Sequence, residues 1–269
     1  MAGPLVAVIT ARMGSERLPG KVMMDLAGKP VTAHMVERLR HVDGIDAVWL
    51  GTSSEENNVP LVALARSLGI EAYAGDPEDV LERHVTIARK SGAESVVRVT
   101  ADCPLFDMPL ASRMIAHHRA TGADFTYVPA VLSVGVLVEV ISRRALELVH
   151  TRYQGELITV PIKEHPEEFH IEAFGVGGDA GGGMDASLYR PEFRLTLDEP
   201  ADYEVLKAIY EALYREGKPV VLREALRFLE AHPEIVALNA GVQQKRGNLY
   251  AQELDARVLA ARGKRTEGR

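Results

Sequence analysis

The chain has 269 residues, of which 46% are hydrophobic and 26% charged. This length and composition are typical of one large globular domain with a sizeable core. The formal net charge of −7 argues against a nucleic-acid-binding surface, so we expect a small-molecule partner.

Other whole-chain features favour a cytoplasmic protein. The single cysteine, Cys103, excludes an internal disulfide and a cysteine-rich metal site. The opening segment MAGPLVAVIT has a short apolar run and no basic region, so it predicts a buried strand rather than a signal peptide. No apolar stretch is long enough for a membrane span, and we expect no membrane partner.

Short apolar runs alternate with helical patterns over the first 121 residues. The pattern predicts strands at 5–9, 47–52, 70–74 and 95–100, and helices at 31–42, 56–68, 78–90 and 108–121. This alternation is typical of an α/β fold with a parallel sheet covered by helices on both faces. Ligands bind beyond the carboxyl ends of such strands, so the loops 10–21, 52–58 and 100–107 should line one crevice.

The pattern changes from about residue 124 to that of a mixed sheet. Strand-like segments lie at 124–128, 134–141, 169–174 and 193–198, with helices predicted at 142–151, 199–217 and 220–233. A glycine-rich segment at 175–185 is either a lid or a linker. We predict a single domain over 1–240, and over 241–269 a basic, polar tail with a possible helix at 250–262.

The loop after the first strand carries the chemistry of an anion-binding site. It is not a P-loop, because five residues separate Gly14 from Gly20 and Val22 stands where a hydroxyl should hold magnesium. Guanidinium, ammonium and glycine-exposed amide groups together suit a phosphate. The alternative is a solvated basic turn. The groups concerned are Arg12, Gly14, Ser15, Arg17, Gly20 and Lys21.

Two aspartates follow apolar strands. Asp102 lies in TADCP and Asp198 in LTLDEP, and paired strand-end carboxylates are ligands that Mg²⁺ prefers. Each could instead be a helix cap or turn residue. Cys103 is better explained as a packing residue than as a nucleophile. The histidines at 117, 118, 165 and 170 lack the spacing of metal ligands.

Four motifs together resemble the cytidylyltransferase-like family of spore coat polysaccharide biosynthesis protein F, which is related to the CMP-sialate and CMP-Kdo synthetases. They are ITARMGSERLPGKVMMDLAGKPV, GDPEDVLERH, VVRVTADCPLFD and FRLTLDEPADYEVLKAIYE, and the similarity covers roughly residues 4–215. The resemblance implies a nucleotide-diphospho-sugar transferase fold, that is, a Rossmann-like α/β domain with a mixed sheet. It also implies transfer of CMP from CTP, with release of pyrophosphate.

The resemblance assigns roles to individual residues. It makes Asp102 and Asp198 the magnesium ligands, and Lys21 and Arg12 the further catalytic residues. It implies that the nucleotide is bound by Ala11, Arg12, Gly14, Ser15, Arg17, Lys21, Thr52, Ser53, Asp76, Asp79, Arg83, Arg98 and Thr100.

The acceptor side departs from the family pattern. Leu137 replaces a usual aspartate, and Leu157 replaces a usual histidine. Glu16 and Ala101 replace a usual threonine and glycine. Glu139 is retained and could orient the acceptor, whose identity the sequence does not give.

The combined prediction is a magnesium-dependent cytidylyltransferase that acts on a sugar or sugar acid in surface polysaccharide biosynthesis. Two alternatives are a glycosyltransferase of the same fold that uses a nucleotide sugar, and a non-catalytic nucleotide-binding homologue. Leu137 and Leu157 favour the non-catalytic homologue. We also expect a homodimer, because the apolar run VPAVLSVGVLVEVI in the segment 130–165 is long for one exposed face.

Overall fold

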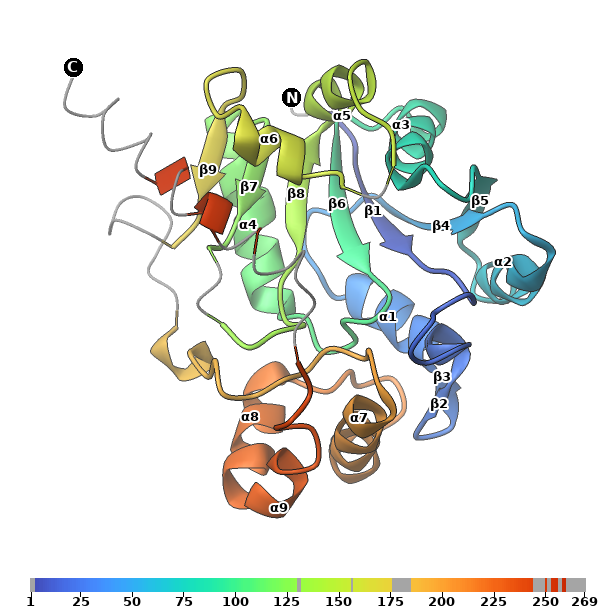
Figure 1. The fold of residues 1–269 in the computed structure, drawn as a ribbon, viewed down its shortest axis with the longest axis vertical. Helices are drawn as coiled ribbons and strands as arrows, with labels where there is room; N and C mark the ends of the chain where they lie inside the picture. Colours follow the sequence, from blue (N-terminus) through green and yellow to red (C-terminus); the bar gives the residue numbers. More distant parts are fainter. Residues whose placement is uncertain are drawn as a thin grey trace.

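The fold is built on a mixed seven-stranded β-sheet with the strand order β5-β4-β1-β6-β8-β7-β9 (Figure 1). The computed structural model describes residues 3–129, 132–155, 157–175, 185–243, 250, 253–255 and 258–259. Strands β5, β4, β1 and β6 are parallel, β8 is antiparallel to both β6 and β7, and β9 is parallel to β7. The predicted mixed, mostly parallel sheet is therefore confirmed. The strands are β1 Leu5–Thr10, β4 Ala47–Ser53, β5 Glu71–Gly75, β6 Ser95–Thr100, β7 Phe125–Tyr127, β8 Glu139–Ser142 and β9 Ile171–Ala173.

Helices cover both faces of this sheet. Alternate residues of β1 point to opposite faces: Leu5 and Ile9 join the core with α1 and α4, whereas Val6 and Val8 join the core with α3 and α5. The α-helices are α1 Val31–Leu39, α2 Val59–Ser67, α3 Val80–Ser91, α4 Met108–Thr121, α5 Arg143–His150, α6 Val160–Glu164, α7 Pro200–Leu213, α8 Leu222–Ala231 and α9 Pro233–Val236. Short elements are 3-10 turns at Lys21–Met23, Glu56–Asn58 and Ala186–Leu188, and a hairpin of β2 Asp25–Leu26 and β3 Lys29–Pro30.

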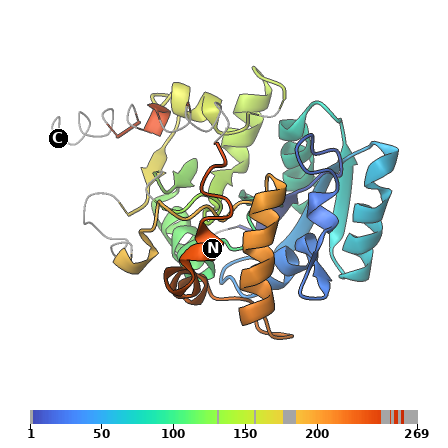
Figure 2. The ribbon, with the colours of Figure 1, turned by 60° about the horizontal axis from the view of Figure 1, so that its bottom comes forward.

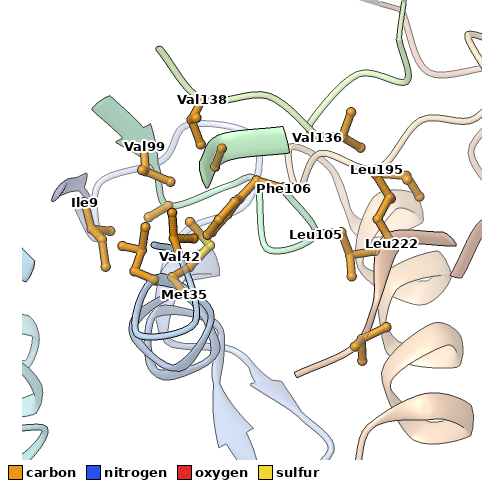
Figure 3. Packing of buried hydrophobic residues seen from close by; sticks show 14 of the residues in the cluster. Ile9, Met35, Val42, Val99, Leu105, Phe106, Val136, Val138, Leu195 and Leu222 are labelled. Atoms are coloured by element: carbon orange, nitrogen blue, oxygen red, sulfur yellow. The ribbon is translucent and has the colours of Figure 1, made fainter. Parts of the chain in front are cut away.

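Helices α7, α8 and α9 gather at one end of the molecule. Figure 1 shows α7, α8 and α9 together, and Figure 2 brings this end forward, with α7 in front of the sheet. One continuous core joins them to the sheet. In Figure 3, Ile9 and Val99 of the sheet lie on one side of this core, with Leu195 and Leu222 on the other side. This packing fixes the segment before α7 against the ends of the central strands.

Two predicted strands differ from the structure. Among the described residues, the segment 193–198 forms no strand and makes a single isolated bridge, between Val134 and Arg194. Its backbone N–H groups donate instead to loop carbonyls: Leu195 to Val134 at 2.8 Å and Leu197 to Asp102 at 2.7 Å.

The strand predicted at 134–141 begins only at Glu139. Gly135 has a φ of 95°, and a Cβ there would lie 2.5 Å from the backbone nitrogen of Thr196. Only glycine allows this approach without strain, and the turn that it makes delays the strand.

Most of the described residues of the apolar run used to predict a dimer face are buried within the chain itself. Val128, Leu132, Val136, Val138 and Val140 are all buried. That argument for a dimer was wrong, because the run completes the core rather than an exposed surface.

Two other predictions fall mainly outside the described residues. The glycine-rich segment is described only at 175 and 185, and the tail beyond 243 only at 250, 253–255 and 258–259, which are helical. The proposed division at residue 240 stays a prediction. Within the described part of the chain, no helix has the length and apolar character needed to cross a membrane.

Candidate active site

A cavity of about 760 Å³ lies at the carboxyl ends of β1 and β6. Four segments line it: the loop after β1, the start of α3, the end of β6, and the segment before α7. Two of the three loops expected to meet in one crevice therefore do so. The lining residues are Thr10, Ala11, Arg12, Ser15, Glu16, Arg17, Lys21, Val22, Glu78, Val80, Arg83, Arg98, Thr100, Ala101, Asp102, Thr196 and Asp198.

The loop after β1 is held in a fixed shape by its own backbone and by a neighbouring loop. The N–H groups of Ser15 and Gly20 donate to the carbonyl of Met13 at 3.0 and 2.9 Å. Gly20 adopts a left-handed conformation with a φ of 70°, which starts the turn that contains Lys21. The Met13 N–H donates to the side chain of Asn58 at 2.8 Å. The loop 52–58 therefore braces the cationic loop instead of lining the cavity.

Lys21 lies between the two predicted metal ligands. Its Nζ donates to Asp102 Oδ2 at 3.1 Å, to Asp198 Oδ1 at 3.0 Å and to the Leu197 carbonyl oxygen at 2.6 Å. Burial alone would lower the pKa of Lys21, but the charges of Asp102 and Asp198 raise it above its ordinary value. The two aspartates thus converge on one point, although the strand expected to carry Asp198 does not form.

Asp198 is surrounded by three cations. Its Oδ1 contacts Lys21, and its Oδ2 contacts Arg17 at 3.3 Å and Arg194 at 2.9 Å. Burial raises the pKa of Asp198, but Lys21, Arg17 and Arg194 more than offset this effect and lower it below its ordinary value. The carboxylate is therefore ionised across the physiological range of pH.

A fully buried carboxylate supports Asp198, and the sequence analysis missed it. Asp202 has 0% exposure, and its side chain accepts bonds from Arg194 at 2.9 Å and from the backbone N–H groups of Asp198 and Glu199 at 2.9 and 3.0 Å. Asn239 donates to it at 3.0 Å. Glu199 and Asp202 form a capping box at the start of α7. An acidic residue three positions after a helix cap was the available signal.

The other part of the cavity is formed by α3 and β6. His84, beside it, is buried, and burial, with smaller effects of Arg98 and Arg83, lowers its pKa to about 3. The imidazole ring of His84 is neutral. Its Nδ1 lies 2.9 Å from the Val80 carbonyl oxygen, which can only accept a hydrogen bond, so Nδ1 carries the proton. Nε2 then accepts from the Thr10 hydroxyl at 3.3 Å. This contact fixes the end of β1 against α3.

Arg98 connects the cavity with the predicted acceptor residue. It lines the cavity, and its Nη1 donates to Glu139 Oε2 on the adjacent strand at 2.7 Å. The Thr159 hydroxyl donates to the other oxygen of Glu139 at 3.3 Å. Glu139 is therefore oriented from two sides, although it is not among the lining residues.

Several predicted nucleotide-binding residues lie outside the lining and bond to nearby loops. Ser53 donates to Glu55 at 2.7 Å. Asp76 accepts from the Glu78 N–H at 2.8 Å, and Asp79 caps α3 by accepting from the Glu82 N–H at 2.9 Å. The predicted residues outside the lining are Gly14, Thr52, Ser53, Asp76, Asp79 and Glu139.

The oxygen atoms that accept hydrogen bonds from Lys21 could also ligate a divalent cation. Two carboxylates and a backbone carbonyl face one position, and hard oxygen donors of this kind suit Mg²⁺. Cys103, next in the chain, is not suited to nucleophilic attack, because burial and the charge of Asp102 raise the pKa of its thiol.

Comparison with known proteins gives one consistent family. The family model described as cytidylyltransferase matches residues 6–235. The spore coat polysaccharide biosynthesis protein SpsF of Bacillus subtilis is 29% identical over 242 residues, which cover 86% of this chain and 95% of that protein.

Two solved structures confirm the predicted fold. A cytidylyltransferase from Leptospira borgpetersenii superposes with a TM-score of 0.76 at 22% identity, covering 90% of this chain and 99% of that chain. The CMP:2-keto-3-deoxy-manno-octonic acid synthetase, solved in complex with CTP, superposes with a TM-score of 0.59 at 19% identity, covering 78% and 99%.

Proposed function

This chain belongs to the cytidylyltransferase family, and we propose that it transfers CMP from CTP to a hydroxyl of a sugar or sugar-acid acceptor in surface polysaccharide biosynthesis. The observation that carries the proposal is the cavity, where a cationic loop faces Asp102 and Asp198. The similarity to SpsF supports the polysaccharide context. The solved relative with bound CTP supports the choice of nucleotide.

The cationic loop is suited to hold the polyphosphate. The acceptor oxygen would attack the α-phosphorus in line, and the bond to the β-phosphate would break to release pyrophosphate. Arg12, Arg17 and Lys21 all line the cavity, and their charges would stabilise the negative charge on the departing group. Three cations at this place suit a pyrophosphate leaving group, which favours nucleotidyl transfer over a glycosyltransferase reaction.

Asp102 and Asp198 are the residues that would hold a magnesium ion. The ion would supply charge neutralisation at the α-phosphate and the acceptor oxygen. Asp198 is well fixed for this task, because Arg194 holds its second oxygen and Asp202 binds its backbone N–H. Rigid placement of such a group lowers the cost of reaching the transition state.

We propose separate roles for the remaining site residues. Arg83, Arg98 and Thr100 line the cavity and would contact the nucleotide or the acceptor. Glu139 would orient the acceptor, since its carboxylate is bonded to Arg98, which lines the cavity. A supporting role, the fixing of loop shape, suits the residues outside the lining, namely Gly14, Thr52, Ser53, Asp76 and Asp79.

The proposed reaction predicts pyrophosphate release that depends on an acceptor. The protein would be incubated with CTP labelled in its α-phosphate, Mg²⁺ and a panel of sugars and sugar acids. We expect pyrophosphate and a labelled CMP-sugar with at least one acceptor. Transfer only from a ready-made nucleotide sugar would establish the glycosyltransferase alternative. CTP binding without turnover over a broad panel would establish the non-catalytic one.

We propose that the chain forms a homodimer through the segment 130–165. The remaining support is the resemblance and two exposed apolar side chains, Leu157 at 61% and Tyr153 at 36% exposure. Light scattering at micromolar concentration should give twice the mass of the chain, and Leu157→Asp should shift it toward one chain. A monomeric mass for the unaltered protein would refute the dimer.

A further inference from the structure

All three hydrogens of the Lys21 ammonium have acceptors within the protein. A lysine ammonium has three N–H donors, and those of Lys21 are directed to Asp102, Asp198 and the Leu197 carbonyl at 2.6–3.1 Å. The residue is 9% exposed. In this arrangement the ammonium has no hydrogen left to donate to a phosphate, although its loop is the one suited to phosphate binding.

The same two carboxylates are those proposed to ligate the divalent cation. An ammonium and a divalent ion that share these oxygens would lie a few ångströms apart and repel each other. Arg17 and Arg194 do not create this conflict, since both contact the second oxygen of Asp198. On Asp102, the contact that Oδ1 receives from the described residues is a weak one, from the Cys103 thiol at 3.5 Å. Lys21 is therefore the cation that must move.

We infer that Lys21 and the divalent cation compete for Asp102 and Asp198, and that the polyphosphate of CTP decides the competition by drawing the ammonium onto its own oxygens. The inference rests on the proposed function. Its physical basis is charge balance: two carboxylates that lose the ammonium gain the metal, and the polyphosphate gains a cation. The metal is therefore bound together with the nucleotide, and the protein alone binds it weakly.

The test measures metal binding without any nucleotide. Mn²⁺ would be titrated into the protein, and the free ion followed by electron paramagnetic resonance. We expect Lys21→Met to bind Mn²⁺ at least tenfold more tightly than the unaltered protein, because the competing charge is gone. The same variant should bind CTP at least tenfold more weakly by calorimetry, because the ammonium is lost from the polyphosphate.

Four further variants distinguish the effects of charge, position and folding. Lys21→Arg keeps the charge and should show no gain in Mn²⁺ affinity. Lys29→Met removes a partly buried lysine that pairs with Glu37 at 3.6 Å, outside the cavity, and should also show none. Adding Asp198→Asn to Lys21→Met should abolish the gain. If Lys21→Met melts too low for titration, Lys21→Gln replaces it.

Equal Mn²⁺ affinity in the unaltered protein and the neutral variant would overturn the inference. A gain that survives Asp198→Asn would also overturn it, because the ion would then bind elsewhere. The proposed metal site fails by a different result: CTP affinity of the unaltered protein that is the same with and without Mn²⁺. The two ideas can thus be refuted separately.

Discussion

Asparagine in place of Asp198 or Asp102 should lower the rate of CMP transfer at least about a hundredfold and weaken CTP binding by less than about tenfold. Both carboxylates face one point at the cavity wall, where the reacting α-phosphate needs charge neutralisation. In the proposed complex the polyphosphate would be bound by Arg12, Arg17 and Lys21, which also line the cavity. Steady-state pyrophosphate release would give kcat, and calorimetry would give the CTP dissociation constant.

The matched control is Asp43→Asn, an exposed aspartate far along the chain from either carboxylate and absent from the cavity lining. It should leave both quantities unchanged. Turnover close to normal in Asp198→Asn would refute the assignment of Asp198 as a magnesium ligand. A loss confined to CTP affinity would instead make the two aspartates part of nucleotide binding alone.

Alanine in place of Asp202 should lower the free energy of unfolding by about 3–5 kcal/mol, because it removes the fully buried partner of an ion pair together with the acceptor of several buried hydrogen bonds. Arg194, whose side chain is 10% exposed, would lose its bond at 2.9 Å. Two backbone N–H groups at the start of α7 would lose their acceptor as well. Urea denaturation, followed by circular dichroism, measures the change.

Glu211→Ala is the control on the same helix. Glu211 is 59% exposed and lies 4.0 Å from Lys207, so its loss should change the free energy of unfolding by no more than about 0.5 kcal/mol. Asp202→Asn, which keeps the shape and loses the charge, should fall between the two. A loss below about 1 kcal/mol in Asp202→Ala would show that the contact with Asp198 is enough to compensate the charge of Arg194.

The parallel half of the fold could be predicted from sequence, because its signals are local and repeated. Buried strands β1, β4 and β6 appear as apolar runs between helical patterns, and loops after β1 and β6 follow from topology. The convergence of Lys21 and Asp102, which follow β1 and β6, was recoverable for the same reason, whereas Asp198 reaches them from a segment that was predicted to be a strand and is not one. Strand-end positions place side chains at one edge whatever the details of the connections.

The second half of the fold could not be predicted where loops form hydrogen bonds with other loops. The segment 193–198 has the composition of a strand, yet its N–H groups bond to Val134 and Asp102 in irregular backbone. Such pairing leaves no periodic pattern in the sequence. Asp202 was overlooked because it lies within the predicted helix 199–217, and the helical pattern does not indicate its polar contacts. Thr52 and Ser53 were expected at the cavity because they follow a strand, but Ser53 and Asn58 bond to each other at 2.7 Å.

The junction that unites the two halves of the site spans a long stretch of chain. Thr196 donates to the Asp102 carbonyl across 94 positions, and all seven strands of the sheet are complete by Ala173, before Asp198 enters the sequence. Closing so long a loop costs conformational entropy, and this cost is offset only when the contacts between the two distant segments form. Folding can therefore finish the scaffold before it creates the carboxylate pair. During synthesis on the ribosome, the strands of the sheet therefore emerge before Asp198, which completes the carboxylate pair.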